Sequence, residues 1–290
     1  MAKIKRSIHK KTSSNIRLRC AKKEIKVSIP EDLTEIPNDI CEISILLHGE
    51  KKIGKSSLFA QEDGAFFLEF DPLQPYAIRQ RHIPDWKHLL AYLDLVEKNP
   101  EKIRSLIWDG VDIAYQLCFD YCCKKMVITH PNEEKDYGQS WRAIRDEFEK
   151  AILRTLNLNE KGIAARFIAH SKWEETETYE GKKIQRLVPY LTGQADEVLT
   201  GRVDAWFAYT YIGRQRVLVV EGSDRIAAGH RVDQQFKTSD GEKLEEIDMG
   251  NSPQQAYQNL LKGFNNELKN SNVDASDKTK KMKFKFKKKG

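Results

Sequence analysis

The sequence has little cysteine and no long apolar run, and both absences narrow the class of protein. Five cysteines in 290 residues are a low and odd number, which disfavours a disulfide-stabilised secreted scaffold. Apolar runs such as residues 43–47 and 217–220 are far shorter than the roughly 18 residues that cross a bilayer. No apolar stretch follows the basic N-terminus, as it would in a secretory signal. We therefore expect a cytoplasmic protein that has no membrane partner.

The composition excludes a chain that is disordered throughout. Apolar residues make up 40% of the chain and charged residues 32%, with a net charge of +6. Residues 1–26 carry ten Lys and Arg against one acidic residue, and residues 278–290 carry eight Lys and no acidic residue. The body between them is acidic. We expect a basic N-terminal arm and lead-in over 1–39, a core over 40–265, and a polar linker with a Lys-rich tail over 266–290.

Two basic arms on an acidic body predict a polyanionic partner, because Lys and Arg clusters bind nucleic acid by releasing counterions from phosphate. The run from Lys281 to Lys287 alternates Lys with Phe284 and Phe286, a composition that stacks bases while pairing with phosphates. Two alternatives remain at this point. The arms are solvated tails that aid solubility, or the C-terminal run is a short edge strand. An anionic membrane surface is disfavoured, since no amphipathic helix accompanies the charge.

Short apolar segments alternate with helical patterns along the core. This order predicts an α/β fold with a mainly parallel central sheet flanked by helices. A polar hairpin with a turn at Glu180-Gly181 is expected over 172–186. The expected strands are 43–47, 65–70, 105–108, 164–169, 205–212 and 216–221, and the expected helices begin near 55 and span 86–96, 111–128 and 141–156.

A phosphate-binding loop is predicted where residues 49–56 match G-x-x-x-x-G-K-[ST] between a buried strand and a helix. The glycines let backbone N–H groups approach phosphate closely. Lys55 would reach the β- and γ-phosphates, and the Ser56 hydroxyl would bind Mg²⁺. The alternative is an ordinary glycine turn with a surface lysine, which the strand-loop-helix context disfavours. The predicted site for ATP is built by Gly49, Glu50, Lys51, Lys52, Ile53, Gly54, Lys55, Ser56 and Ser57.

A metal-binding carboxylate is expected at the end of a neighbouring buried strand. Asp109 ends the 105–108 strand and would hold Mg²⁺ together with Ser56. The alternative for Asp109 is a helix cap or a turn residue. Asp112, three residues further on, fits a cap or a helix surface better than a metal ligand.

Hydrolysis also requires a group that orients the attacking water, and Asp71 is the preferred candidate because it follows the strand after the loop helix. Glu69 shares its face two residues earlier and is the second candidate. The alternative for Asp71 is a loop carboxylate without a catalytic role. His170, at the end of the fourth strand, would hydrogen-bond the γ-phosphate and signal its presence to the next segment. Its alternative is a local hydrogen bond.

The order of these segments resembles the ATPase core of RecA-type proteins. It is most similar to phage-encoded RecA-like nucleotide-binding proteins associated with single-strand annealing, over about residues 40–235. The resemblance implies a RecA-like P-loop NTPase core, a homo-oligomer, and the cytoplasm of a bacterial host. Besides the loop, it rests on Phe-Phe-Leu-Glu-Phe-Asp-Pro at 66–72, Leu-Ile-Trp-Asp at 106–109, His-Pro at 130–131, Tyr-Gly at 137–138, Phe-Ile-Ala-His-Ser at 167–171 and Ala-Gly-His-Arg at 228–231.

The resemblance also assigns roles to individual residues. RecA-type proteins have a catalytic glutamate where Asp71 stands and a glutamine where His170 stands, and the phage group has histidine there. DNA-binding loops are implied at 129–140 and 171–192. Several glutamates in the second loop would repel phosphate. The residues of that loop expected to contact single-stranded DNA are Lys172, Trp173, Lys182, Lys183 and Arg186.

Two further groups have simple structural interpretations. Cys118, Cys122 and Cys123 lack paired C-x-x-C spacing and fit a buried helix better than a zinc site. Arg225 and Arg231 would act as arginine fingers if they reached the γ-phosphate of a neighbouring subunit. Surface ion pairs are the favoured interpretation of both arginines.

The sequence therefore predicts a Mg²⁺-dependent P-loop ATPase that acts on single-stranded DNA in phage recombination or replication. A phage single-strand-binding, annealing or replication protein is a further expected partner. The alternative is a nucleotide-gated binding or loader module that hydrolyses little and regulates a DNA-processing partner. A helicase motor is disfavoured by the short chain.

Overall fold

The computed structural model of the chain describes residues 35–133, 136–178 and 180–269. The chain divides into residues 1–35 and 36–290, and every element below belongs to the second unit. Both clusters of basic residues, 1–26 and 278–290, lie outside the described residues, so the predictions for them are untested. No described helix is long and apolar enough to cross a membrane.

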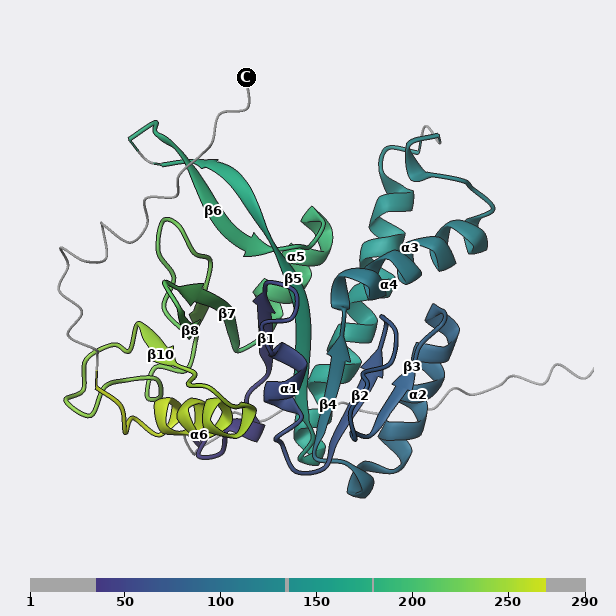
Figure 1. Ribbon diagram of the computed structural model, residues 1–290. Coiled ribbons are helices and arrows are strands. Elements are labelled where there is room, and N and C mark those ends of the chain that lie inside the picture. The colour runs from purple at the N-terminus through teal and green to yellow at the C-terminus, as the bar shows by residue number, and fades with distance from the viewer. Residues whose placement is uncertain (1–34, 134–135, 179, 270–290) are drawn as a thin grey trace, which may run out of the picture. The chain divides into compact units, whose positions relative to one another are not determined.

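A mainly parallel β-sheet forms the centre of the core, as the alternating segments predict (Figure 1). Its strands run in the order β10, β8, β7, β1, β5, β4, β2 and β3. All neighbours from β7 to β3 are parallel, whereas β8 is antiparallel to β7 and β10. The bounds are β1 Ile45–Gly49, β2 Ala65–Glu69, β3 Gln80–His82, β4 Ser105–Asp109, β5 Ala164–Glu177, β6 Lys183–Pro189, β7 Ala205–Ile212, β8 Gln215–Val219, β9 Gly229–His230 and β10 Glu246–Asp248.

Helices cover both faces of the sheet, because side chains along each buried strand alternate between two apolar layers. On β1, Leu46 packs in the layer that contains α2, α3, α4 and α5, whereas Ile45 and Leu47 pack in the layer of α1 and α6. Leu106 and Ile107 of β4 alternate in the same way. The bounds are α1 Lys55–Phe59, α2 Trp86–Lys98, α3 Val111–Met126, α4 Gln139–Leu156, α5 Gly193–Arg202 and α6 Pro253–Phe264.

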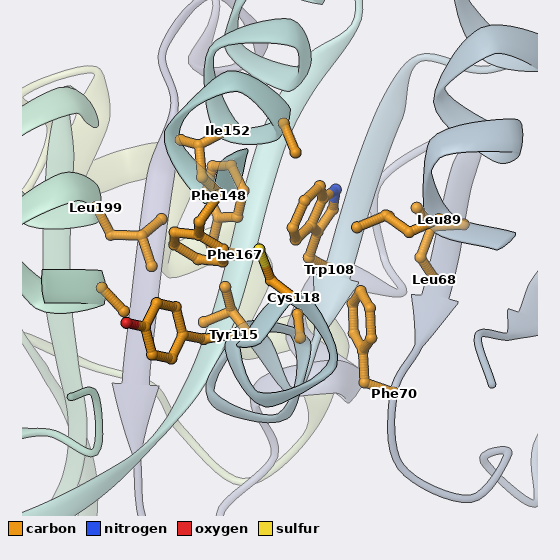
Figure 2. Packing of buried hydrophobic residues seen from close by; sticks show 14 of the residues in the cluster. Leu68, Phe70, Leu89, Trp108, Tyr115, Cys118, Phe148, Ile152, Phe167 and Leu199 are labelled. Carbon is orange, nitrogen blue, oxygen red and sulfur yellow. The ribbon is translucent and has the colours of Figure 1, made fainter. Parts of the chain in front are cut away.

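Aromatic rings fill the layer between the sheet and the helices α2, α3 and α4 (Figure 2). The Trp108 ring of β4 lies 5.7 Å from Phe70, 6.4 Å from Trp86 and 5.7 Å from Phe167, measured between centroids. Phe148 of α4 stacks on Trp86 at 6.1 Å. Side chains of this size stabilise the fold by about 2–3 kcal/mol each when buried. This packing fixes the ends of β2, β4 and β5, where the candidate site residues lie.

The predicted strands and helices of the core are confirmed, with differences at their ends. The main difference is β5, which continues beyond residue 169 and leaves the sheet to pair with β6 (Figure 1). The expected hairpin over 172–186 therefore forms, but it is an antiparallel ribbon continuous with a central strand. Gly181 adopts a positive φ of 76° in its turn. The helices α5 and α6 and the short strands β3, β9 and β10 were not expected.

Candidate nucleotide-binding site

The parallel pairing brings the carboxyl ends of four strands to one edge of the sheet. Gly49 of β1 is the register partner of His170 on β5. Glu69 of β2 is the register partner of Asp109 on β4. In open α/β sheets, ligands bind beyond the carboxyl ends of the strands. The predicted phosphate loop, the predicted metal carboxylate and the predicted γ-phosphate sensor therefore all lie along the edge where a ligand is expected.

Glycine is required at both ends of the phosphate loop. A Cβ atom on Gly49 would lie only 2.3 Å from the Tyr209 carbonyl oxygen, so β7 leaves no room for a side chain there. Gly54 has a φ of 113°, in the left-handed region that favours glycine. The helix α1 begins directly after it, at Lys55. The glycine turn of the loop is thus built into the junction of β1 and α1.

Lys55 is buried inside the loop and does not project into solvent. Its side chain is only 7% exposed, and its Nζ donates hydrogen bonds to the Gly49 carbonyl at 3.0 Å and the Glu50 carbonyl at 2.8 Å. Burial lowers the pKa of Lys55 to about 8, and Asp109 opposes this shift. The alternative of a surface lysine is therefore wrong. The ammonium group lies where it can exchange two carbonyl partners for phosphate oxygens.

Asp109 and Ser56 lie together, as the metal prediction requires. The Ser56 hydroxyl and the Lys55 ammonium both oppose the burial that raises the pKa of Asp109, so both groups lie near its carboxylate. The second carboxylate oxygen, Oδ2, is buried without a hydrogen-bond partner. An unpartnered buried oxygen of this kind fits a bound cation. Among the described residues, no three His, Cys, Asp or Glu side chains surround a common metal position, so water or a ligand would complete the coordination of Mg²⁺.

The strand after the loop helix ends earlier than expected, which changes the relation of the two candidate bases. β2 ends at Glu69, and Asp71 lies beyond the strand. Beyond it, the Phe70 N–H still donates to the Asp109 carbonyl at 3.0 Å, and the chain bends at residues 70–72. Asp71 still lies near the site, since its charge raises the pKa of both Glu69 and Asp109.

Glu69 is the more buried of the two candidate bases. Its side chain is fully buried, and neither of its oxygens makes a hydrogen bond of normal geometry. Burial, with the nearby Asp109 carboxylate, raises the pKa of Glu69 to about 8, and Gln74 offsets part of the shift. Glu69 is therefore protonated at neutral pH in the protein without ligands.

His170 lies at the point where β5 leaves the sheet, and it contacts an acidic side chain. Its Nδ1 is 3.1 Å from the Asp112 Oδ2. The other Asp112 oxygen is buried without a partner, and the charge of Asp112 also acts on Lys55. Asp112 was expected to be a cap or a surface residue. It lies in the first turn of α3 with its side chain only 11% exposed, and it pairs with His170.

The sequence profile of the AAA domain family matches residues 42–232, which include the phosphate loop, the strand-end carboxylates and His170. The chain belongs to the AAA domain family. This membership confirms the predicted class of P-loop ATPase domain, whereas the phage origin and the annealing family stay predictions. No curated protein matches the chain in sequence. Among solved structures, a KaiC-like protein from the hyperthermophilic archaeon Pyrococcus horikoshii matches with 12% identity and a TM-score of 0.37, covering 73% of this chain and 87% of that chain.

Two residues of the AAA domain take part in the site without having been predicted. Burial raises the pKa of Tyr76 and the Ser57 and Ser56 hydroxyls oppose this rise, so the phenol lies near the end of the loop. His48, just before the loop, is completely buried, with Nε2 2.7 Å from the Ala227 carbonyl and Nδ1 2.8 Å from the Ser171 hydroxyl. A carbonyl only accepts, so Nε2 donates and Ser171 donates to Nδ1. The signal in the sequence is that His48 is a polar residue in an otherwise apolar strand, because a buried polar side chain needs hydrogen-bond partners.

The residues expected to contact DNA lie on the β5–β6 ribbon of the AAA domain, and most of their charges are paired with glutamates. Lys172 lies 3.1 Å from Glu174, and Lys183 lies 2.7 Å from Glu175. Lys182 is paired at 2.7 Å with Glu180. Trp173 is 55% exposed. Arg186 lines a polar cavity of about 440 Å³ together with Glu221 and His230. The ribbon therefore offers an exposed ring but little free positive charge.

The remaining candidates take structural places in the AAA domain. Cys118, Cys122 and Cys123 are buried in α3, and they join no metal cluster among the described residues. Arg231 donates to the Val203 carbonyl at 2.6 Å. The Arg225 residue also takes part in an interaction. The described contacts of Arg231 therefore hold it within its own chain.

Proposed function

We propose that this AAA domain is a Mg²⁺-dependent ATPase. The observation that carries the proposal is the convergence of Lys55, Asp109 and Glu69 at one edge of the sheet. Asp109 and Glu69 are register partners, and Lys55 lies in the phosphate loop near Asp109. Such a set has the cation, the metal carboxylate and the base that phosphoryl transfer to water needs. Each of these groups is buried, so the site would exclude bulk water once the nucleotide is bound.

Phosphate binding would rest on the loop and on Lys55. In the protein without nucleotide, the Lys55 ammonium lies inside the loop and donates to two carbonyl oxygens. Phosphate oxygens would replace these two partners. Exchange of a neutral carbonyl for an anionic oxygen strengthens the hydrogen bond. Mg²⁺ would be held by Ser56 and Asp109, and the bound metal would neutralise charge on the β- and γ-phosphate oxygens.

The attacking water would be oriented by a carboxylate at the end of β2. Glu69 is the better placed candidate, since it is the register partner of Asp109. Asp71 is the second candidate, two residues beyond the strand. His170 would bind the γ-phosphate in place of Asp112 and so connect the nucleotide to the ribbon that begins at Ser171.

A slow or absent hydrolysis is the second candidate function, and one observation favours it. With a pKa of about 8, Glu69 carries a proton at neutral pH and cannot accept another. Unless a bound cation lowers this pKa, the domain would bind nucleotide and switch a partner without rapid turnover. Turnover of ATP measured with and without DNA separates the two functions.

For the biological role, we propose action on single-stranded DNA in phage recombination or replication, as the sequence resemblance implies. The basic arms support a polyanionic partner through their Lys and Arg content. Trp173 supports base stacking because its ring is exposed on the ribbon. A homo-oligomer and a phage single-strand-binding, annealing or replication protein remain part of this proposal.

The experiment that tests the ATPase compares Lys55→Ala with Lys87→Ala. Lys87 is an exposed lysine on α2, away from the loop. Binding of a fluorescent ATP analogue and release of phosphate are measured for both variants. We expect Lys55→Ala to weaken ATP binding by about 100-fold, and Lys87→Ala to match the wild type. ATP binding that survives Lys55→Ala would contradict the proposed function.

A further inference from the structure

A second cationic group lies beside the phosphate loop, on the flank opposite the carboxylates. Gly49 pairs with His170 of β5 on one side and with Tyr209 of β7 on the other. The strand β8 continues the sheet beyond β7, with Arg216 directly opposite Tyr211. Because side chains alternate along strands, Arg216 shares a face with Tyr209 and Tyr211. Tyr209 packs in the same apolar layer as α1, so this is the face from which α1 leaves the loop.

The Arg216 guanidinium reaches the second glycine of the loop. Its Nη1 lies 3.6 Å from the position that a Cβ atom on Gly54 would take, and the Tyr209 hydroxyl lies 3.9 Å from the same point. Its Nη2 donates to the Asn251 carbonyl at 2.9 Å. Arg216 also offsets part of the rise that burial causes in the pKa of Tyr209. The guanidinium is thus held in place by a neutral oxygen and a phenol.

Arg216 has no anionic partner within the described part of the chain. The ion pairs of the described residues do not include it, and its side chain is only partly exposed. By contrast, the buried Arg166 is paired with Glu62 at 2.8 Å. A partly buried charge without a counter-charge is costly. A guanidinium keeps several free donors after two contacts, in a planar fork that matches phosphate.

The direction of the bound triphosphate decides which phosphate Arg216 would meet. Lys55 reaches the β- and γ-phosphates in this motif, and Ser56 with Asp109 lies toward β4. The γ-phosphate end of a bound nucleotide would therefore point to the β5–β4–β2 flank. The other end of its phosphate chain and the nucleoside would then lie toward β7 and β8, where Arg216 is.

We propose that Arg216 is a nucleotide-binding residue that contacts the α-phosphate of the bound nucleotide from within the same chain. The inference rests on the proposed nucleotide binding and adds a residue that the loop motif does not contain. An α-phosphate contact is present with ATP and with ADP alike. It stabilises ground state and transition state equally, so it contributes to affinity and not to the chemical step.

The test compares Arg216→Gln with Arg214→Gln in the full chain. Arg214 is an exposed arginine on the same β7–β8 hairpin, two residues from Arg216. Dissociation constants for ATP and ADP are measured by calorimetry, and kcat is measured at saturating ATP. We expect Arg216→Gln to raise both dissociation constants by about 10–100-fold with kcat unchanged, and Arg214→Gln to leave them at the wild-type values. Arg216→Lys keeps the charge but loses the fork, so its affinities fall between the two.

Several outcomes would overturn the proposal. Unchanged ATP and ADP affinities in Arg216→Gln, while Lys55→Ala loses binding, would refute the role of Arg216 and leave the ATPase intact. Loss of ATP affinity alone would place Arg216 at the γ-phosphate. An equal loss of nucleotide affinity in Arg214→Gln would show that the loss in Arg216→Gln comes from surface charge in general and not from a phosphate contact. If Arg216→Gln does not fold, a full-affinity Arg216→Lys variant with unchanged ADP binding would argue against a forked contact. A wild-type chain that binds no nucleotide would refute the proposed function itself.

Discussion

Glu69 and Asp109 are register partners at the carboxyl ends of neighbouring parallel strands, and both carboxylates are buried. Two buried acids this close cannot both ionise easily. Burial and the Asp109 charge raise the pKa of Glu69 to about 8, so one proton resides on Glu69 at neutral pH. A cation between the strands would relieve the repulsion. This pair therefore links metal binding to the protonation state of the candidate base.

With bound Mg²⁺ lowering the pKa of Glu69 so that its carboxylate ionises, Glu69→Gln is expected to lower kcat by about 100-fold or more with ATP binding retained, because the amide cannot accept a proton from water. The variant keeps the size of the side chain in a buried position. Single-turnover phosphate release and an ATP-binding titration measure the two effects separately.

Asp71→Asn provides the matched comparison at the second candidate base. Since Asp71 lies beyond the end of β2, we expect a smaller loss than in Glu69→Gln. A larger loss in Asp71→Asn would make Asp71 the base. Equal full activity in both variants would remove the end of β2 from the mechanism.

Gly49→Ala is expected to destabilise the fold by about 1–3 kcal/mol. The added Cβ would meet the Tyr209 carbonyl oxygen at 2.3 Å, so β1 and β7 must separate. Gly201→Ala, in α5, has nothing within 4 Å of the added atom and should stabilise the chain by about 0.5–1 kcal/mol. Urea denaturation of the two variants measures the difference, and an unchanged midpoint for Gly49→Ala would show that the strands accommodate the methyl group.

His48 should make the stability depend on pH in the acidic range. Burial lowers the pKa of His48 from 6.5 to about 4, so the unfolded chain binds the proton more tightly. The contribution of neutral His48 to the free energy of unfolding is complete above pH 6.5. It is lost as the pH falls toward 4, by about 1.4 kcal/mol per pH unit. His48→Gln keeps one donor and one acceptor but does not titrate, so its free energy of unfolding should fall less steeply over this range. Parallel curves for the two proteins would argue against a neutral buried histidine.

Binding of single-stranded DNA should depend on the arms more than on the ribbon. Replacing the eight Lys of residues 278–290 with Gln is expected to lower the salt dependence of binding, by about 0.7 in the log–log slope per lost phosphate contact. Lys183→Gln is the comparison, because Lys183 is already paired with Glu175 and should change affinity less than about twofold. Fluorescence anisotropy over a salt series measures both. A large effect of Lys183→Gln would move the DNA site to the ribbon.

The local signals in the sequence were sufficient for the phosphate loop and for the strands around it. The loop requires glycines and a lysine at fixed spacing within one turn of chain, and apolar runs mark the buried strands by their length. The α6 helix carried comparable signals, since Ser252 caps the Gln255 N–H and Pro253 occupies the first turn. These two residues are sufficient to predict the start of α6. The short strands β3, β9 and β10 had no such signals, because two or three residues show no periodicity.

The sequence by itself determined that this chain is an α/β P-loop domain, and it predicted a site at Lys55, Ser56 and Asp109. Only the tertiary structure decided that Glu69 and not Asp71 is opposite Asp109, that Asp112 pairs with His170, and that Arg216 lies beside Gly54. The physical reason is separation along the chain. A loop motif consists of adjacent residues. Strand register and cross-strand neighbours depend instead on how segments many residues apart align in the sheet.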